Sequence, residues 1–427
     1  MRYLHFVHAA ATVALDPPPL LEPAQLERYA DAAVRSCLGL REGDDLLLTG
    51  DPAHRELLVA LAASGYRAGA GSVDLVYAET RAQAARMRLA AEEHLGALPP
   101  WERSRLRARR RPTTCAVTVL GEGDFDAFAD VPPQRLATEF ARSGKARRPF
   151  TLASQRGFLR WVGMAWPTPA WACRVYPELA VDEAERRLAH DLLHFCRLGP
   201  DDPPGSEGWT THTAALVERG RALTGLGLTR LELRGPGTRL DLALAPGSRW
   251  LGGPRTNAHG YTVAGNFPTE ENFTSPDPAG TEGTFRCSRP LVHRGRVIEG
   301  IAGEFRGGRL VRLEAATEAA RRSLADALAA DRGAQRLGEV ALVDSSSRIG
   351  RADRTYFTTL IDENAAAHIA FGYGFDLTRE PGSQGRGVNR SALHLDVMIG
   401  TDDFEATGVT AEGHRVPLLA GGDWQVP

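Results

Sequence analysis

Residues 45–77 read DLLLTGDPAHRELLVALAASGYRAGAGSVDLVY, and this stretch decides the fold of the first half of the chain. Residues 45–49 form a short apolar run typical of a buried strand, and residues 73–77 form a second one. Between them, residues 54–66 have apolar side chains at helical spacing and end among glycines. This order of strand, helix and strand predicts a mostly parallel sheet wrapped by helices.

The alternation continues outward from this stretch to about residue 200. The expected elements are a helix with Thr80 as its N-cap over 80–94, a strand over 115–120, and helices near 133–142 and over 181–197. A linker of proline, glycine and acidic residues, GPDDPPGSEG, follows at 199–208. We therefore expect residues 1–205 to form an N-terminal α/β domain with a mostly parallel sheet.

The second half has the short alternating runs and glycine turns of a β-rich structure. The expected strands lie within 229–244 and over 297–304, 310–313, 339–343 and 393–397, and one long helix covers 315–331. We therefore expect residues 206–427 to form a β-rich α+β domain, which gives a chain of the α/β class with two domains.

The charge balance excludes several classes of protein. The 427 residues include 51 lysines and arginines and 53 acidic residues, for a net charge of −2. Proteins that bind nucleic acid or anionic membranes usually carry a basic excess, so we expect neither partner. The chain has one lysine, Lys145, and no glycine run precedes it, which excludes a phosphate-binding loop of the G-x-x-x-x-G-K type.

The five cysteines are odd in number and scattered, without a C-x-x-C pair. This pattern indicates neither a disulfide framework nor a thiolate metal site, and it fits a reducing compartment. No run of 18 apolar residues predicts a transmembrane helix. The first 15 residues resemble a signal peptide only faintly, because His5 and His8 interrupt the apolar run. We expect a cytoplasmic protein.

One metal-site pattern in the first half has a simpler explanation. His190 and His194 in HDLLH lie four residues apart, which is the ligand spacing of H-E-x-x-H zinc sites. Asp191 stands where those sites have a glutamate, and the surrounding residues form an ordinary amphipathic helix. We therefore favour a structural role for both histidines.

The last 160 residues or so hold a set of carboxylates and imidazoles in apolar surroundings. In SALHLDVMIG, His394 and Asp396 are expected on one face of a strand, with leucines and valine on the other. Glu339 opens the apolar strand GEVALV, and His368 lies in DENAAAHIAFG, which we expect to be helical. Buried charges of this kind are costly unless something pairs with them, and a metal ion would.

These oxygen and nitrogen ligands suit zinc, cobalt or manganese, and two-metal hydrolases hold their ions about 3.5–4 Å apart. Taken singly, each residue has another explanation. Glu339 fits an edge-strand charge, and Asp396 fits a hydrogen-bonded core carboxylate.

Five motifs in the second half agree in order and interval with a known family. They are NFPTEENFTSP, LGEVALVDSS, DENAAAHIAFG, GVNRSALHLDVMIG and the terminal GGDW. Together they resemble the aminopeptidase T family of metallo-aminopeptidases, and weaker similarity runs through the first half. The resemblance implies a homodimeric two-metal exopeptidase. It also implies five metal ligands: one glutamate of PTEE, Glu339, His368, His394 and Asp396.

Two positions of this resemblance need separate comment. Intervals favour Glu271 over its neighbour Glu270 as the first ligand, which leaves Glu270 as the expected general base. In the family, a tyrosine implicated in catalysis follows the motif histidine by seven residues, and here that position is Phe375. Tyr373 is two residues earlier and would substitute for it if the segment is a strand.

We therefore predict a two-metal aminopeptidase that removes N-terminal residues from short peptides or amino-acid amides through a water held between the ions. Zinc or cobalt is the expected metal, with manganese or magnesium as further options. Glu363 is a candidate for receiving the substrate ammonium group; the alternative is that Glu363 is an exposed acid at a helix start, favoured there by the helix dipole. Two other functions stay open, namely hydrolysis of a specialised amide or amino-acid conjugate, and an inactive relative that acts as a binding or scaffold protein.

Overall fold

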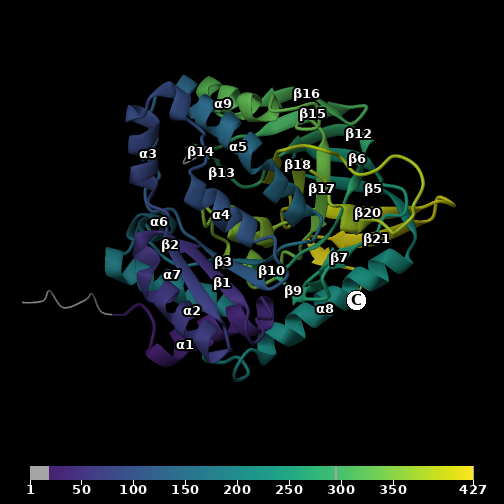
Figure 1. Cartoon of the computed structure of the whole chain (residues 1–427). Helices are drawn as coiled ribbons and strands as arrows, with labels where there is room; N and C mark the ends of the chain where they lie inside the picture. The colour runs from purple at the N-terminus through teal and green to yellow at the C-terminus, as the bar shows by residue number, and fades with distance from the viewer. Residues whose placement is uncertain (1–18, 294–295, 427) are drawn as a thin grey trace, which may run out of the picture.

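A computed structural model describes residues 19–293 and 296–426 (Figure 1). The amino-terminal stretch compared above with a signal peptide lies outside the described residues. Within the described part, no helix has the length and apolar character needed to cross a membrane.

A five-stranded parallel sheet forms the centre of the first half, in the order β10-β4-β3-β1-β2. Its strands are β1 (Asp45–Gly50), β2 (Ser72–Tyr77), β3 (Thr114–Leu120), β4 (Arg160–Ala165) and β10 (Gly265–Phe267). With α2 (Arg55–Arg67) between β1 and β2, the unit predicted from residues 45–77 is confirmed. Strand β10 comes from the second half of the sequence.

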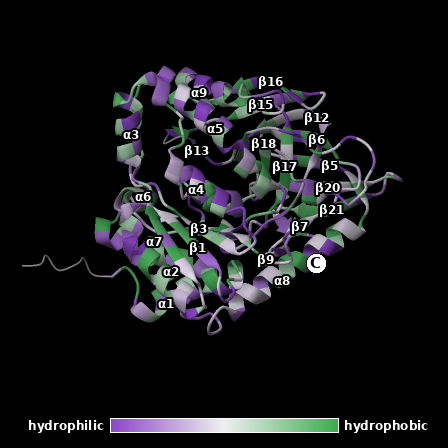
Figure 2. Ribbon diagram, viewed as in Figure 1, coloured by the Kyte–Doolittle hydropathy of each residue, from purple (hydrophilic) through white to green (hydrophobic). Residues whose placement is uncertain are grey.

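Helices surround this sheet, as Figure 1 shows at the left of the molecule. They are α1 (Pro23–Asp31), a π-helix (Ala32–Cys37), α3 (Thr80–Leu89), α4 (Pro100–Ala108), α5 (Pro133–Gln155), α6 (Pro169–Val175) and α7 (Val181–Phe195). Leucines and valines of β1, β3 and α2 form a buried core with α1 and α7. Figure 2 shows β1 and β3 as hydrophobic strands within this layer.

The helix expected over 80–94 is shorter than predicted. Helix α3 ends at Leu89 because Ala90 is extended, and a separate 3-10 turn covers Glu92–His94. The N-cap is Glu79, whose carboxylate accepts a hydrogen bond from the backbone N–H of Arg81, and Thr80 is the first helical residue. The helix expected near 133–142 continues to Gln155 as α5.

Two large antiparallel sheets and the long helix α8 (Glu207–Gly225) build most of the second half. Two small antiparallel pairs accompany them: β8 (Arg255–Thr256) with β9 (Thr262–Val263), and β13 (Leu291–His293) with β14 (Arg296–Ile298). The first sheet has the order β19-β18-β17-β11-β7, and the second has the order β16-β15-β12-β6-β5-β20-β21-β22. The first contains β7 (Leu251–Gly252), β11 (Asn272–Thr274), β17 (Leu337–Leu342), β18 (His368–Gly372) and β19 (His394–Met398). The second contains β5 (Leu228–Gly235), β6 (Thr238–Leu244), β12 (Pro276–Arg286), β15 (Ala302–Arg306), β16 (Arg309–Glu314), β20 (Glu405–Thr410), β21 (Arg415–Ala420) and β22 (Asp423–Trp424).

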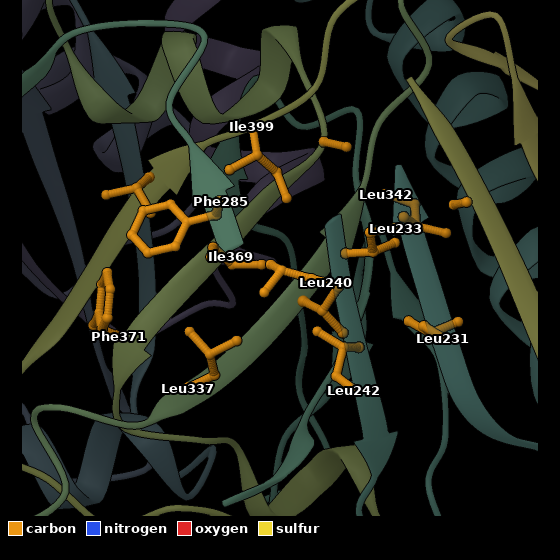
Figure 3. Close-up of a cluster of buried hydrophobic side chains, with 14 of the residues drawn as sticks. Leu231, Leu233, Leu240, Leu242, Phe285, Leu337, Leu342, Ile369, Phe371 and Ile399 are labelled. Carbon is orange, nitrogen blue, oxygen red and sulfur yellow. The ribbon is translucent and has the colours of Figure 1, made fainter. Parts of the chain in front are cut away.

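The two antiparallel sheets share one apolar core. Figure 3 shows Leu240 of β6 beside Ile369 of β18, and Leu242 of β6, Leu337 of β17 and Phe371 of β18 belong to the same cluster. These side chains are almost fully buried, so only one face of the β17–β19 sheet is available for polar groups. The predicted class is confirmed: a parallel α/β sheet is followed by a β-rich half. The helix expected over 315–331 is α9 (Glu318–Leu328), which is shorter than predicted.

The helix predicted for DENAAAHIAFG is wrong. Helix α10 (Thr359–Asp362) ends where this motif begins, Glu363–Ala365 form one 3-10 turn, and the motif continues as strand β18. The alanines favour a helix intrinsically, but β18 is the central strand between β17 and β19 and is buried along its whole length. Pairing on both sides overrides the local preference.

The halves are joined by a shared cluster and an ion pair. Trp171 and Phe195 pack with Tyr356 and Ile361, and Arg348 lies 2.6 Å from Asp202 in the linker. Helix α8 begins just after the expected boundary at 205, whereas β10 returns to the first sheet.

Candidate metal centre

The face of the β17–β19 sheet opposite the apolar core carries the predicted polar residues. On β19, Leu395 and Val397 point into the core, and His394 and Asp396 alternate with them. On β18, Ile369 lies in the core, so the adjacent His368 faces the other way. The alternation of side chains along each strand therefore places the imidazoles and carboxylates on one face of the sheet.

On β17, Val340 and Leu342 lie in the core, and Glu339 has the same orientation as His368. A register irregularity after Leu337 lets that leucine reach the core although it is two residues before Glu339. Ala370 lies between Glu339 and Asp396 across the three strands. Its small side chain leaves space above the sheet for the two carboxylates to approach each other.

The structure brings all five predicted ligands together as two groups of three. One group is Glu271, Glu339 and His368, and the other is Glu339, His394 and Asp396. Within each group, one ligand atom from each residue lies within 4.8 Å of the others. Glu339 belongs to both, so the arrangement has the form of two adjacent cation sites that share one carboxylate.

Both imidazoles are oriented by backbone carbonyls. Nδ1 of His368 lies 3.2 Å from the carbonyl oxygen of Ala366, and Nδ1 of His394 lies 2.9 Å from that of Tyr373. When Nδ1 carries the proton, it donates a hydrogen bond to the carbonyl oxygen. Nε2 of the neutral ring is then unprotonated, and its lone pair faces the carboxylates.

The short distances between each Nε2 atom and the carboxylate oxygens require a positive charge between them. Nε2 of His368 lies 3.2 Å from Oε2 of Glu271, and Nε2 of His394 lies 3.1 Å from Glu339 and 3.3 Å from Asp396. A lone pair facing carboxylate oxygens this closely is repulsive unless a proton or a metal ion lies between them. The donor set of carboxylates and imidazoles, without thiolates, fits zinc, cobalt or manganese.

Burial and mutual repulsion shift the pKa of these groups. Burial raises the pKa of Glu339, and the neighbouring Glu271 raises it further. Burial alone would lower the pKa of His368, but Glu271 and Asp396 outweigh it and raise that pKa to about 10. Burial also opposes charge on His394, yet Asp396 and Glu339 hold its pKa well above the usual range. Without a metal, the chain therefore holds protons at this centre.

The metal-free protein is expected to lose stability as the pH rises. A folded-state histidine pKa of about 10 contributes stability that is complete below the unfolded value of 6.5 and is lost as the pH rises toward 10. The raised pKa of Glu339 acts in the same direction. Bound metal replaces these protons, so its binding should release protons at neutral pH. Melting temperatures of metal-free and metal-loaded protein between pH 6.5 and 9 test this; parallel curves would contradict it.

Glu363 is a further carboxylate at the same centre. It is buried in the turn before β18, and Asn266 of β10 donates a hydrogen bond of 2.9 Å to Oε1. Burial raises its pKa well above the usual value, and Asp396 and Glu271, one from each group of three, raise it further. Glu363 therefore faces both groups, and the strand that completes the first sheet orients it.

Glu270 lies away from the centre, although it adjoins Glu271. Its carboxylate forms two hydrogen bonds with Arg197, at 2.5 and 2.9 Å, and lies 3.3 Å from His212. Burial, assisted by Arg197, lowers the pKa of His212 to about 3, so this histidine is neutral. The adjacent glutamates thus point to different surroundings, and the structure brings only Glu271 to the other ligands.

The chain matches a family model described as thermophilic metalloprotease (M29) over residues 23–424. It is 34% identical over 406 residues to aminopeptidase T from Thermus thermophilus and 31% identical over 407 residues to aminopeptidase 2 from Geobacillus stearothermophilus. These alignments cover 94% of this chain and 98% and 97% of the relatives. The chain belongs to the M29 family of metalloproteases. It is therefore a metallo-aminopeptidase, and the predicted resemblance is confirmed.

A solved structure agrees with this assignment. Wild-type AmpT from Thermus thermophilus superposes on the chain with a TM-score of 0.85 at 34% identity, covering 94% of this chain and 99% of that one. The M29 fold therefore extends over both halves, including the first sheet, whose sequence similarity was the weaker part of the resemblance.

Two aromatic residues of this M29 chain have different positions relative to the centre. Phe375 packs with its ring centroid 5.1 Å from that of His394 and lines the cavity above the ligands. Tyr373 is fully buried behind it, with ring centroids 5.6 Å apart. Residue 373 follows the end of β18, and its hydroxyl is not directed into that cavity. An apolar ring therefore covers His394.

The centre lies in a cavity of about 230 Å³ that adjoins a second one of about 1110 Å³. Trp161, Arg255, Gly265 and Phe375 line both. The HDLLH pattern is far less enclosed, because His190 and His194 are exposed and Asp191 accepts a hydrogen bond from Tyr356. Neither histidine belongs to a group of possible metal ligands among the described residues.

Proposed function

We propose that the chain is a two-metal aminopeptidase that hydrolyses the first peptide bond of short peptides, with Glu271, Glu339, His368, His394 and Asp396 as ligands. The observation that carries the proposal is the shared Glu339 within two groups of three ligand atoms. Zinc or cobalt fits this donor set best, and manganese or magnesium remains acceptable. The relatives, which are named aminopeptidases, support an exopeptidase rather than an endopeptidase.

Bound divalent ions would supply Lewis acidity, which lowers the pKa of water and polarises a carbonyl group. The chain must supply a base for the attacking water, and Glu363 is the carboxylate with the required surroundings. It faces both groups of ligands, and Asn266 holds it through Oε1. Glu363 takes the proton from the attacking water and passes it to the leaving amine. This assignment replaces Glu270, which Arg197 already engages.

Metal removal tests the function directly. Protein stripped with a chelator should release no leucine from leucyl peptides, and added zinc or cobalt should restore hydrolysis. We expect activity on several different N-terminal residues. Restored metal without hydrolysis of any free-amino peptide would contradict the aminopeptidase proposal.

One specific observation favours a second candidate, a specialised amide or amino-acid conjugate as substrate. Phe375 supplies no hydroxyl above His394, whereas the family tyrosine would, so a donor to the tetrahedral intermediate is missing from that side. Efficient turnover of one conjugate with poor turnover of all leucyl peptides would support this candidate. An inactive binding protein would bind metal weakly and would hydrolyse neither the conjugate nor the leucyl peptides.

Glu270→Gln tests the structural role proposed for Glu270. The change leaves the Arg197 guanidinium, which is largely buried, without its anionic partner. We expect the free energy of unfolding to fall by about 3 kcal/mol, while kcat of the metal-loaded protein changes less than tenfold. Denaturant unfolding and steady-state kinetics measure the two effects. A loss of kcat above 100-fold at unchanged stability would restore Glu270 as the base.

We also propose a cytoplasmic homodimer. The five cysteines are all unpaired, which fits a reducing compartment. The dimer follows from the family resemblance, and light scattering of the purified protein tests it.

A further inference from the structure

The cavity of about 1110 Å³ beside the metal centre is strongly basic. Five arginines line it, against two acidic residues, Asp376 and Glu380. Two of the five are already engaged: Arg221 pairs with Glu218, and Arg379 donates to backbone carbonyls. Asp376 is likewise engaged, by Arg390 at 2.5 Å.

The remaining arginines, Arg156, Arg249 and Arg255, have no side-chain hydrogen bond or ion pair among the described residues. Arg249 and Arg255 are half-buried, and Arg255 lies over the Phe273 ring at 5.4 Å. A half-buried guanidinium without a partner loses hydration and gains little in return. An anion that entered the cavity would give these groups a direct partner; Arg255 has only charge interactions without direct contact, with Glu271 and Glu339.

The arrangement of the two cavities fixes where such an anion would lie. Arg255 lines both cavities, whereas Arg249 lines only the larger one. The smaller cavity encloses the metal centre, where an aminopeptidase holds the first residue of its substrate, so we expect the residues after the scissile bond to extend into the adjoining larger cavity. One extended residue spans about 3.5 Å. We therefore expect the carboxylate of a dipeptide to lie near Arg255, which lines both cavities, and a more distant carboxylate to lie near Arg249, which lines only the larger one.

We propose that the larger cavity binds the leaving part of the substrate, and that Arg255 and Arg249 select leaving parts that carry a carboxylate. The preferred substrates are then short anionic peptides. Arg255 binds the carboxylate nearest to the scissile bond, because two N–H groups of its guanidinium can donate hydrogen bonds to the two carboxylate oxygens. This inference rests on the proposed aminopeptidase activity, which supplies the direction of the bound peptide.

The first experiment compares Leu-Ala with Leu-Ala amide on the zinc-loaded enzyme. We expect kcat/KM to be about tenfold or more higher for the free acid, the factor typical of one hydrogen bond between charged groups. A second comparison, of Leu-Asp amide with Leu-Asn amide, tests a side-chain carboxylate in the same way. Together the two pairs distinguish recognition of the terminal carboxylate from recognition of a side-chain carboxylate. Equal kcat/KM within both pairs would overturn the inference.

Arg255→Gln should reduce the preference for Leu-Ala over its amide to about twofold or less, with most of the loss in KM. Arg249→Gln, a second variant, should reduce the preference for peptides with a more distant carboxylate. Arg221→Gln is the matched control, because that arginine lines the same cavity but pairs with Glu218. An unchanged preference in correctly folded Arg255→Gln and Arg249→Gln would overturn the assignment.

Binding separates this inference from the proposed function. Phosphinic analogues of Leu-Ala, which carry a tetrahedral phosphorus in place of the scissile carbonyl, are titrated as free acid and as amide. Tighter binding of the acid without turnover of any peptide would contradict the function and support the carboxylate site. Turnover with equal binding of both analogues would overturn the carboxylate site and leave the function intact. Failure of either analogue to bind would overturn the carboxylate site.

Discussion

Glu339→Gln is expected to remove both metal ions and to lower kcat/KM at least about 10³-fold. Glu339 belongs to both groups of ligands, so its loss affects both sites at once. Glutamine keeps the size of the buried side chain, and it relieves rather than creates repulsion with Glu271. Folding should therefore survive the change.

The contrast with single-site variants makes this prediction specific. Glu271→Gln should affect one ion and Asp396→Asn the other, because each residue belongs to one group only. Glu405→Gln is the control, since that residue is exposed on β20. Elemental analysis with kinetics measures metal and activity on the same samples. Glu339→Gln protein with two ions per chain would contradict the shared-ligand geometry.

Glu363→Gln is expected to lower kcat by about 10²–10⁴-fold while both metal ions stay bound. The amide has no basic oxygen for the proton of the attacking water, but it still accepts the hydrogen bond from Asn266. Because Glu363 lies outside both groups of three, the ligand set is unchanged.

The pH profile distinguishes this role from a merely structural one. In the native enzyme, kcat should fall at low pH as the base is protonated, and Glu363→Gln should lack that acidic limb. Retained kcat would contradict the role of Glu363 as the base. Loss of one ion from Glu363→Gln would show that Glu363 is instead a ligand.

The site residues that could be predicted from the sequence are those whose orientation follows from the alternation of side chains along a strand. His394 and Asp396 alternate with Leu395 and Val397, so the period of two residues already separates a polar face from the core face. Glu339 is a charge within an apolar strand, which is costly without a partner. These signals are local, and the structure brings the residues together as expected.

Other features depend on contacts that are distant in sequence. The alanines before His368 favour a helix, and only the pairing of β18 with β17 and β19 makes that segment a strand. The two adjacent glutamates differ because Arg197, more than 70 residues earlier, binds Glu270. Asn266 reaches Glu363 because β10 joins the first sheet.

The count of zinc ions bound per chain tests the central claim most directly. Protein stripped with a chelator, reloaded with zinc and freed of excess metal is analysed by native mass spectrometry. The two groups of ligands predict two ions per chain in the native protein. A chain that binds one ion, or none, would contradict the two-metal centre.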